Sequence, residues 1–159
     1  MILAIDPGLA YIGIAMVTDT GEWADQDTIK LGGNMNPEDR IAVIQAELEQ
    51  ILDDWPRPTI AVIDQFALYG FKGAITNAFQ MGRVIQAILD ILLDHLIPVG
   101  SVPARDVRRY ITGNPNAKSP QIKEGLRAMG YDRRSNEHER DALALALCWR
   151  DMGRQEKAV

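Results

Sequence analysis

Two short apolar segments, residues 2–6 and 60–64, each end in an aspartate. Both are typical of buried strands, and a buried strand places its last residue at the edge of a sheet, where the side chain can face a cleft. For Asp6 a turn role explains the residue equally well, because Pro7-Gly8 follows it. No turn signal follows Asp64, and an unpaired buried carboxylate is costly. The two segments therefore predict a sheet with at least one functional edge.

The order of the other segments predicts the fold class. Residues 12–18 and 23–31 read as strands that form a meander with the first, and residues 98–102 read as a fifth strand. Helical spacing and capping signals predict helices at 37–54, 74–96, 103–110, 121–129 and 136–149. The apolar side of the long second helix is predicted to carry Phe79, Val84, Ile88, Ile91 and Leu92. We expect an α/β fold with a mixed five-stranded sheet flanked by helices.

Length and composition limit the domain organisation and the class of protein. A chain of 159 residues suits one domain, which we assign to residues 1–150, followed by a polar tail at 151–159. The single cysteine, Cys148, excludes an internal disulfide and a cysteine-based zinc site. The apolar run 85–97 carries Asp90, Asp94 and His95, so it does not resemble a membrane span. We expect no signal peptide and a cytoplasmic location, in a bacterium or in the host cell of a phage.

Charge is distributed unevenly along the chain. The net charge is −5, with 5 Lys or Arg against 14 Asp or Glu in residues 1–100, and 12 against 8 in residues 101–159. A basic half can present a local phosphate-binding face on an acidic protein. An uneven solvated surface explains the same numbers, so charge permits nucleic acid as a partner without arguing for it.

The segment 136–144 adds a third acidic position. His138 and Asp141 are three residues apart, so they share one face of a helix, and Glu137, four from Asp141, also qualifies. Glu139 points elsewhere and fits a capping pair with Asn136. A capping or dipole role accounts for the glutamates, but Asp141 directly precedes the apolar run 142–148 and is expected near the core.

Three carboxylates from two strand ends and one helix, Asp6, Asp64 and Asp141, repel one another unless a cation lies between them. Oxygen ligands favour Mg²⁺ or Mn²⁺ over zinc, and two such ions suit metal-assisted phosphodiester hydrolysis. His138 is a candidate to orient the attacking water, to act as a base or to ligate a metal. A structural role for a single histidine beside a helix start stays open.

Five motifs in order resemble the RuvC family of Holliday-junction resolvases. The chain opens with Ile2-Leu3-Ala4-Ile5-Asp6-Pro7-Gly8 and Gly13, and Asp64-Gln65 precedes an aromatic loop. Gln80-Met81-Gly82-Arg83 is similar to the start of the family's long helix. The basic stretch from Arg105 through Lys118 to Gln121 and the segment His138-Glu139-Arg140-Asp141-Ala142-Leu143-Ala144 resemble its last two motifs. The resemblance covers nearly the whole chain.

The resemblance implies an RNase H-like fold and a Mg²⁺-dependent homodimer that nicks two strands of a four-way DNA junction symmetrically. Mn²⁺ is expected to substitute. The implied catalytic and metal-binding residues are Asp6, Asp64, His138 and Asp141. Phosphate contacts are implied for Arg105, Arg108, Arg109 and Lys118. Phe66, Tyr69 or Phe71 would stack on bases at the crossover, although packing of their loop onto the core is an equal alternative.

Three features depart from the family pattern. Asp64 stands where the family usually has glutamate, the chain is acidic whereas bacterial members are generally basic, and the loop after Asp64 is slightly longer. They suggest a divergent, phage-type member and put in doubt the metal spacing, the wedge residue and the restriction to Holliday junctions. The sequence does not indicate a helicase partner or a cleavage-site preference.

Three other functions compete with junction cleavage. Asp6-x-Gly8 and Gly13 also resemble the phosphate loop of actin-like ATPases, but that fold needs two lobes, which 159 residues do not supply. An RNase H-like nuclease that acts on flaps, other branched DNA or RNA stays open. So does a non-catalytic module that binds junctions.

Overall fold

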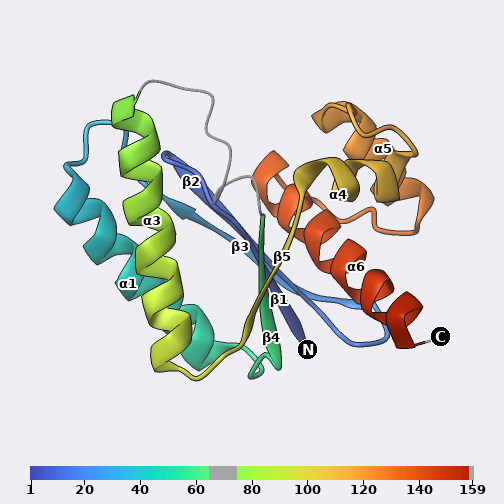
Figure 1. Ribbon diagram of the computed structural model, residues 1–159, viewed down its shortest axis with the longest axis horizontal. Helices are drawn as coiled ribbons and strands as arrows, with labels where there is room; N and C mark the ends of the chain where they lie inside the picture. Colours follow the sequence, from blue (N-terminus) through green and yellow to red (C-terminus); the bar gives the residue numbers. More distant parts are fainter. Residues whose placement is uncertain (65–74, 158–159) are drawn as a thin grey trace.

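A five-stranded mixed sheet forms the centre of the computed structural model, which describes residues 1–64 and 75–157 (Figure 1). Its strands are β1 (Ile2–Asp6), β2 (Tyr11–Val17), β3 (Trp23–Lys30), β4 (Ile60–Asp64) and β5 (Val99–Val102). They lie in the order β3-β2-β1-β4-β5. The first three pair antiparallel, whereas β4 is parallel to β1 and β5 to β4. The predicted meander followed by two further strands is confirmed.

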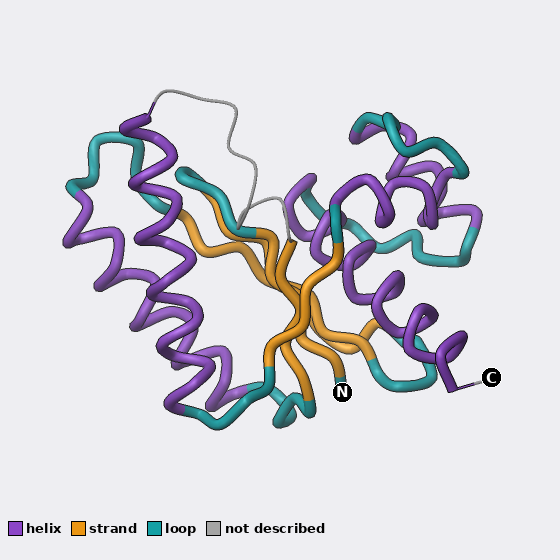
Figure 2. Tube along the Cα trace, in the orientation of Figure 1, coloured by secondary structure: helices purple, strands orange, loops and turns teal. Residues whose placement is uncertain are grey.

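Two long helices cover one face of the sheet, α1 (Pro37–Asp54) and α3 (Ile75–Asp94) (Figure 2). Alternate strand residues point to this side, because side chains along a strand alternate between its two faces. Leu3 and Ile5 of β1 are fully buried here, in a cluster that includes Ile44 of α1 and Ile88 of α3. This apolar layer attaches α1 and α3 to the sheet.

The apolar side of α3 begins later than the sequence predicts. Val84, Ile88, Ile91 and Leu92 are buried as expected, but Phe79 is 70% exposed. Helical spacing identifies a face of a helix but not the turn at which the helix meets the sheet, and in α3 the contact with the core starts at Val84. No helix within residues 1–64 and 75–157 is both long and apolar enough to cross a membrane.

The other face of the sheet lies under α6 (Glu137–Lys157), with α4 (Ala104–Thr112) and α5 (Ser119–Ala128) packed against that helix (Figure 1). Small side chains line the contact: Ala4 and Ala15 on the strands and Ala142 and Ala146 on the helix are all buried. Because these residues add little bulk, α6 lies close to the sheet. Its first turn reaches the edge where β1 and β4 end.

The helix α6 also continues to Lys157, so the expected polar tail from residue 151 is helical over most of its length. The sequence predicts a helix that ends at residue 149, whereas side-chain hydrogen bonds fix the start of this additional segment. Tyr110 of α4 donates a hydrogen bond to the Asp151 carboxylate, and Arg150 Nε donates to the same group at 2.6 Å. The helix α6 thus continues past its apolar residues, and at Asp151 it is hydrogen-bonded to α4.

Candidate active site

The parallel pairing of β1 and β4 brings two aspartates to one edge of the sheet. Ile5 lies opposite Ile63 in this ladder, so the strands end side by side, with Asp6 last in β1 and Asp64 last in β4. Both carboxylates line a pocket of about 100 Å³. The other lining residues come from α4, α5 and α6, namely Ala104, Val107, Arg108, Ile122, Asp141, Ala144 and Leu145.

The start of α6 reaches this edge because β2 offers it a glycine. Gly13 lies opposite Asp6, and a Cβ atom on Gly13 would lie 2.1 Å from the backbone oxygen of His138. No larger residue allows this approach without moving the helix. The imidazole of His138 is thereby placed beside Asp6, with Nδ1 3.8 Å from Oδ2. That separation is an ion-pair distance, longer than a hydrogen bond.

Tyr11, at the start of β2, holds the other side of the His138 ring. The two rings stack with centroids 5.2 Å apart and planes inclined by 22°. The Asp6 carboxylate raises the pKa of His138, and partial burial opposes this effect. A histidine with a raised pKa keeps its proton, or shares it with Asp6, up to a higher pH than an isolated imidazole does.

The carboxyl group of Asp141 lies in a strongly perturbed environment within the pocket. Burial, together with the negative charges of Asp6 and Glu137, raises its pKa to about 7, while the positive charges of His138 and Arg108 act in the opposite direction. Such crowding of negative charge favours either a retained proton or a bound cation.

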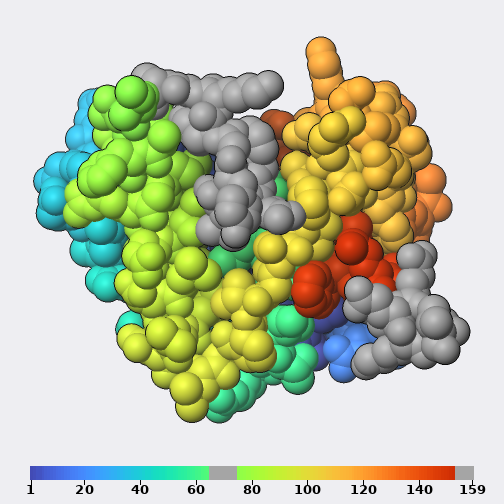
Figure 3. All heavy atoms as spheres, in the orientation of Figure 1, coloured from blue at the N-terminus to red at the C-terminus, as the bar shows by residue number. Residues whose placement is uncertain are grey.

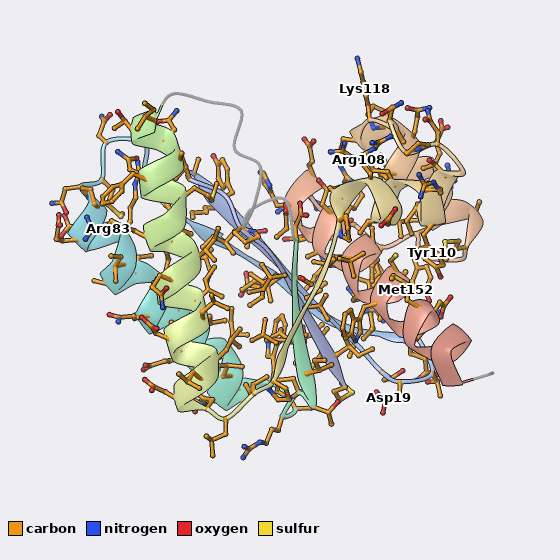
Figure 4. The ribbon with its side chains drawn as sticks, in the orientation of Figure 1. Asp19, Arg83, Arg108, Tyr110, Lys118 and Met152 are labelled. Atoms are coloured by element: carbon orange, nitrogen blue, oxygen red, sulfur yellow. The ribbon has the colours of Figure 1, made fainter. Side chains whose placement is uncertain are left out.

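The basic residues predicted to contact phosphate do not surround the pocket evenly. Arg108 lines it, and in Figure 4 its side chain lies on the side of α4 that faces the ends of β1 and β4. Arg105 is exposed on the same helix. Arg109 forms an ion pair with Asp106 at 2.8 Å. Lys118 precedes α5 and projects away from the body of the protein (Figure 4).

The family is decided by a match over almost the whole chain. A model described as "Crossover junction endodeoxyribonuclease RuvC" matches residues 2–149. The chain belongs to the RuvC family. The motifs read from the sequence predicted this family, and the match confirms it.

Individual RuvC relatives align with this chain over most of their length. The crossover junction endodeoxyribonuclease RuvC of Synechococcus sp. (strain CC9902) is 28% identical over 151 residues, which covers 92% of this chain and 95% of the relative. That of Salinibacter ruber is also 28% identical, over 93% of this chain and 83% of the relative.

Solved structures share the fold. Thermus thermophilus RuvC in complex with a Holliday junction substrate superposes with a TM-score of 0.81 at 20% identity, covering 98% of this chain and 95% of that one. The yeast mitochondrial Holliday junction resolvase Ydc2 gives 0.60 at 12% identity, over 99% and 82%. At such identities the likeness concerns the fold, and it confirms the predicted RNase H-like architecture.

Several other residues that the sequence analysis considered for the site are not among the described residues that line the pocket. Phe66, Tyr69 and Phe71 lie outside the described residues. Glu137 is exposed and influences Asp141 by its charge. Glu139 points away from the pocket, as expected, and its carboxylate accepts hydrogen bonds from the backbone and side chain of Asn136 at 3.0 and 2.9 Å.

The chemistry of the donors fits the divalent metal that a RuvC-type nuclease implies, because three carboxylates with oxygen ligands line one pocket. Within residues 1–64 and 75–152 no three His, Cys, Asp or Glu side chains are close enough together to form a complete ligand group. The carboxylates therefore line one pocket without forming a preassembled metal site in this part of the chain.

Two residues of the site escaped the sequence analysis. Tyr11 lies just before the predicted strand 12–18 and carried no signal of its own, and Gly13 was noted only as part of a motif. Both follow from alternation along β2, because residues 11 and 13 share the face that α6 covers. The strand pattern could have identified them once the position of the last helix was known.

Proposed function

We propose that this protein is a divalent-metal-dependent endonuclease that resolves four-way DNA junctions. The observation that carries the proposal is the pocket at the end of the parallel strands, which is lined by Asp6, Asp64 and Asp141 together with Arg108. Family membership supports this assignment, and so does the fold shared with a RuvC that binds a Holliday junction substrate. Mg²⁺ is the expected ion, two per site, and Mn²⁺ is expected to substitute.

In the proposed mechanism Asp6, Asp64 and Asp141 would hold the cations. Bound there, the ions would neutralise charge at the scissile phosphate and make a nearby water more acidic. Asp6 faces Nδ1 of His138 and favours a proton on that nitrogen, and the neutral ring, present above its raised pKa, would accept the proton of the attacking water at Nε2. Arg108 binds a phosphate oxygen at the mouth of the pocket and holds the phosphodiester in place.

A labelled four-way junction, with duplex, flap and RNA–DNA hybrid as competitors, tests the proposal in Mg²⁺, Mn²⁺ or EDTA. We expect paired nicks in the junction with either metal, none in EDTA, and none with Asp6→Asn or Asp141→Asn. Asp53→Asn, an exposed change on α1, is the matched control and should cut normally. Junction binding without cleavage by the wild type would favour a binding module. Cleavage of the hybrid or the flap alone would favour the other nuclease functions.

We also propose that two copies act together through α3. Four exposed apolar residues lie on this helix or in the turn after it: Ile75, Phe79, Leu93 and Leu96. In Figure 3 the atoms of this segment (green) form a broad outer surface, separate from those of α4 and α5 (yellow to orange). A two-fold dimer would present two pockets to a nearly two-fold junction. Sedimentation should show a dimer that Phe79→Asp weakens, and a wild type that stays monomeric while cutting junctions contradicts this arrangement.

A further inference from the structure

Three residues form a row across the antiparallel strands, directly under the start of α6. Asp6 of β1 pairs with Gly13 of β2, and Gly13 pairs with Thr28 of β3. Paired residues in neighbouring strands point to the same face of a sheet, so all three lie on the side that α6 covers. Gly13 touches the His138 backbone, and Asp6 faces its ring. The outer end of the row, Thr28, is not part of the pocket.

Thr28 instead contacts the residues on either side of His138. Its hydroxyl donates a hydrogen bond to Oε1 of Glu139 at 3.0 Å and accepts one from Nδ2 of Asn136 at 2.7 Å. Gln26, two residues earlier on the same strand, donates to Oε2 of Glu139 at 3.0 Å. β3 is thus bound to the first turn of α6 by three side-chain hydrogen bonds.

These bonds exceed what the helix start needs. The capping pair is complete without β3, because Asn136 Oδ1 accepts from the Glu139 backbone at 3.0 Å and Glu139 accepts in return from the Asn136 backbone. The bonds from β3 add a connection between positions more than 100 residues apart in the chain. They fix where the turn lies on the sheet rather than whether it forms.

We propose that Thr28 is a positioning residue for catalysis, which acts through Glu139 to hold His138 against Asp6. This inference rests on the proposed nuclease function. The hydroxyl of Thr28 touches neither the pocket nor the reacting phosphate. Its removal lets the first turn of α6 shift along the sheet, and the distance between His138 and Asp6 changes with it. Small misplacements of catalytic groups slow a reaction strongly, because reaction rates depend steeply on geometry.

The variant Thr28→Val tests this, since it keeps the shape of the side chain and removes only the hydroxyl. Thr28→Ser restores the hydroxyl. Thr59→Val is the matched control, because the Thr59 hydroxyl donates to the Met1 carbonyl oxygen at 2.9 Å, at the opposite end of β4. Gln26→Leu provides a second route should Thr28→Val fail to fold, since it removes the other bond from β3.

Two readouts are needed, kinetics and proton NMR of the histidine rings. We expect Thr28→Val to lower kcat for junction cleavage roughly tenfold with KM unchanged, and Thr28→Ser to restore most of the rate. In the metal-free protein without DNA, at pH 9, the ring-proton shifts of His138 should move in Thr28→Val and stay in place in Thr28→Ser and Thr59→Val. The chain contains only two histidines, so His95, in the turn directly after α3, serves as an internal reference.

Unchanged His138 shifts in both Thr28→Val and Gln26→Leu would overturn the inference, as would equal losses of kcat in Thr28→Val and Thr59→Val. A change in the His138 ring-proton shifts with an unchanged kcat would also overturn it, because the position of His138 would then be irrelevant to cleavage. A wild type that cuts no branched DNA removes the proposed function instead. The NMR comparison still decides, in that case, whether β3 positions His138.

Discussion

Replacing Asp141 with asparagine should stabilise the metal-free protein at pH 8 while abolishing cleavage. The pKa of this carboxyl group rises from 3.8 in an exposed chain to about 7 in the fold. A raised carboxyl pKa means that the fold favours the protonated form. The associated stability is present in full below about pH 4 and is lost as pH rises through 7.

The size of the effect follows from linkage. At about 1.4 kcal/mol for each tenfold change in proton affinity, the shift corresponds to about 4 kcal/mol at pH 8, as an upper bound. Local relaxation and water reduce it, so we expect Asp141→Asn to unfold at a free energy about 2–4 kcal/mol higher than the wild type at pH 8. The advantage should shrink steadily between pH 7 and pH 4.

Urea unfolding in EDTA, followed by tryptophan fluorescence at pH 4.5, 6 and 8, measures this difference. Asp53→Asn, which removes an exposed charge, serves as the control. Added Mg²⁺ at pH 8 should stabilise the wild type and leave Asp141→Asn almost unchanged, since the cation relieves the same repulsion. Equal stabilities at pH 8, or a difference independent of pH, would refute the reasoning.

Three further changes test other parts of the site. Gly13→Ala should lower the free energy of unfolding by about 1–3 kcal/mol in urea titrations and reduce cleavage, because its Cβ would overlap the His138 backbone oxygen. A variant that folds and cuts normally would contradict the close packing. Arg108→Ala should raise KM for the junction and raise the pKa of Asp141 further, visible as an alkaline shift of the pH–rate profile. Lys118→Ala should weaken junction binding and lower its salt dependence relative to Lys123→Ala, and an unchanged salt slope would remove Lys118 from the DNA surface.

Most of the fold could be predicted because its signals are local. The runs at residues 2–6 and 60–64 are too apolar to lie anywhere but in a sheet interior, and their order with the helices fixed the class of fold. The exposed Phe79 and the helical tail through Lys157 could not be read in this way. Both depend on how far one element extends along another, which is a property of packing rather than of periodicity.

The residues of the site divide in the same way, into those with local sequence signals and those that depend on packing. Asp6 and Asp64 could be placed because parallel neighbours end at one edge, and Asp141 because it begins an apolar helical run. The stack of Tyr11 on His138 and the hydrogen bonds from Thr28 could not, because they join segments more than 100 residues apart. Nothing in a single sequence marks such pairs in advance.

The pocket draws its acids from the first strand and the last helix of the fold, with residue 64 between them. During synthesis, a ribosome that has added residues 1–130 has produced two of the aspartates but neither His138 nor Asp141. The nascent chain then lacks α6, the helix that covers one face of its sheet. All three acids of the pocket are therefore in place only after α6 has docked on the sheet.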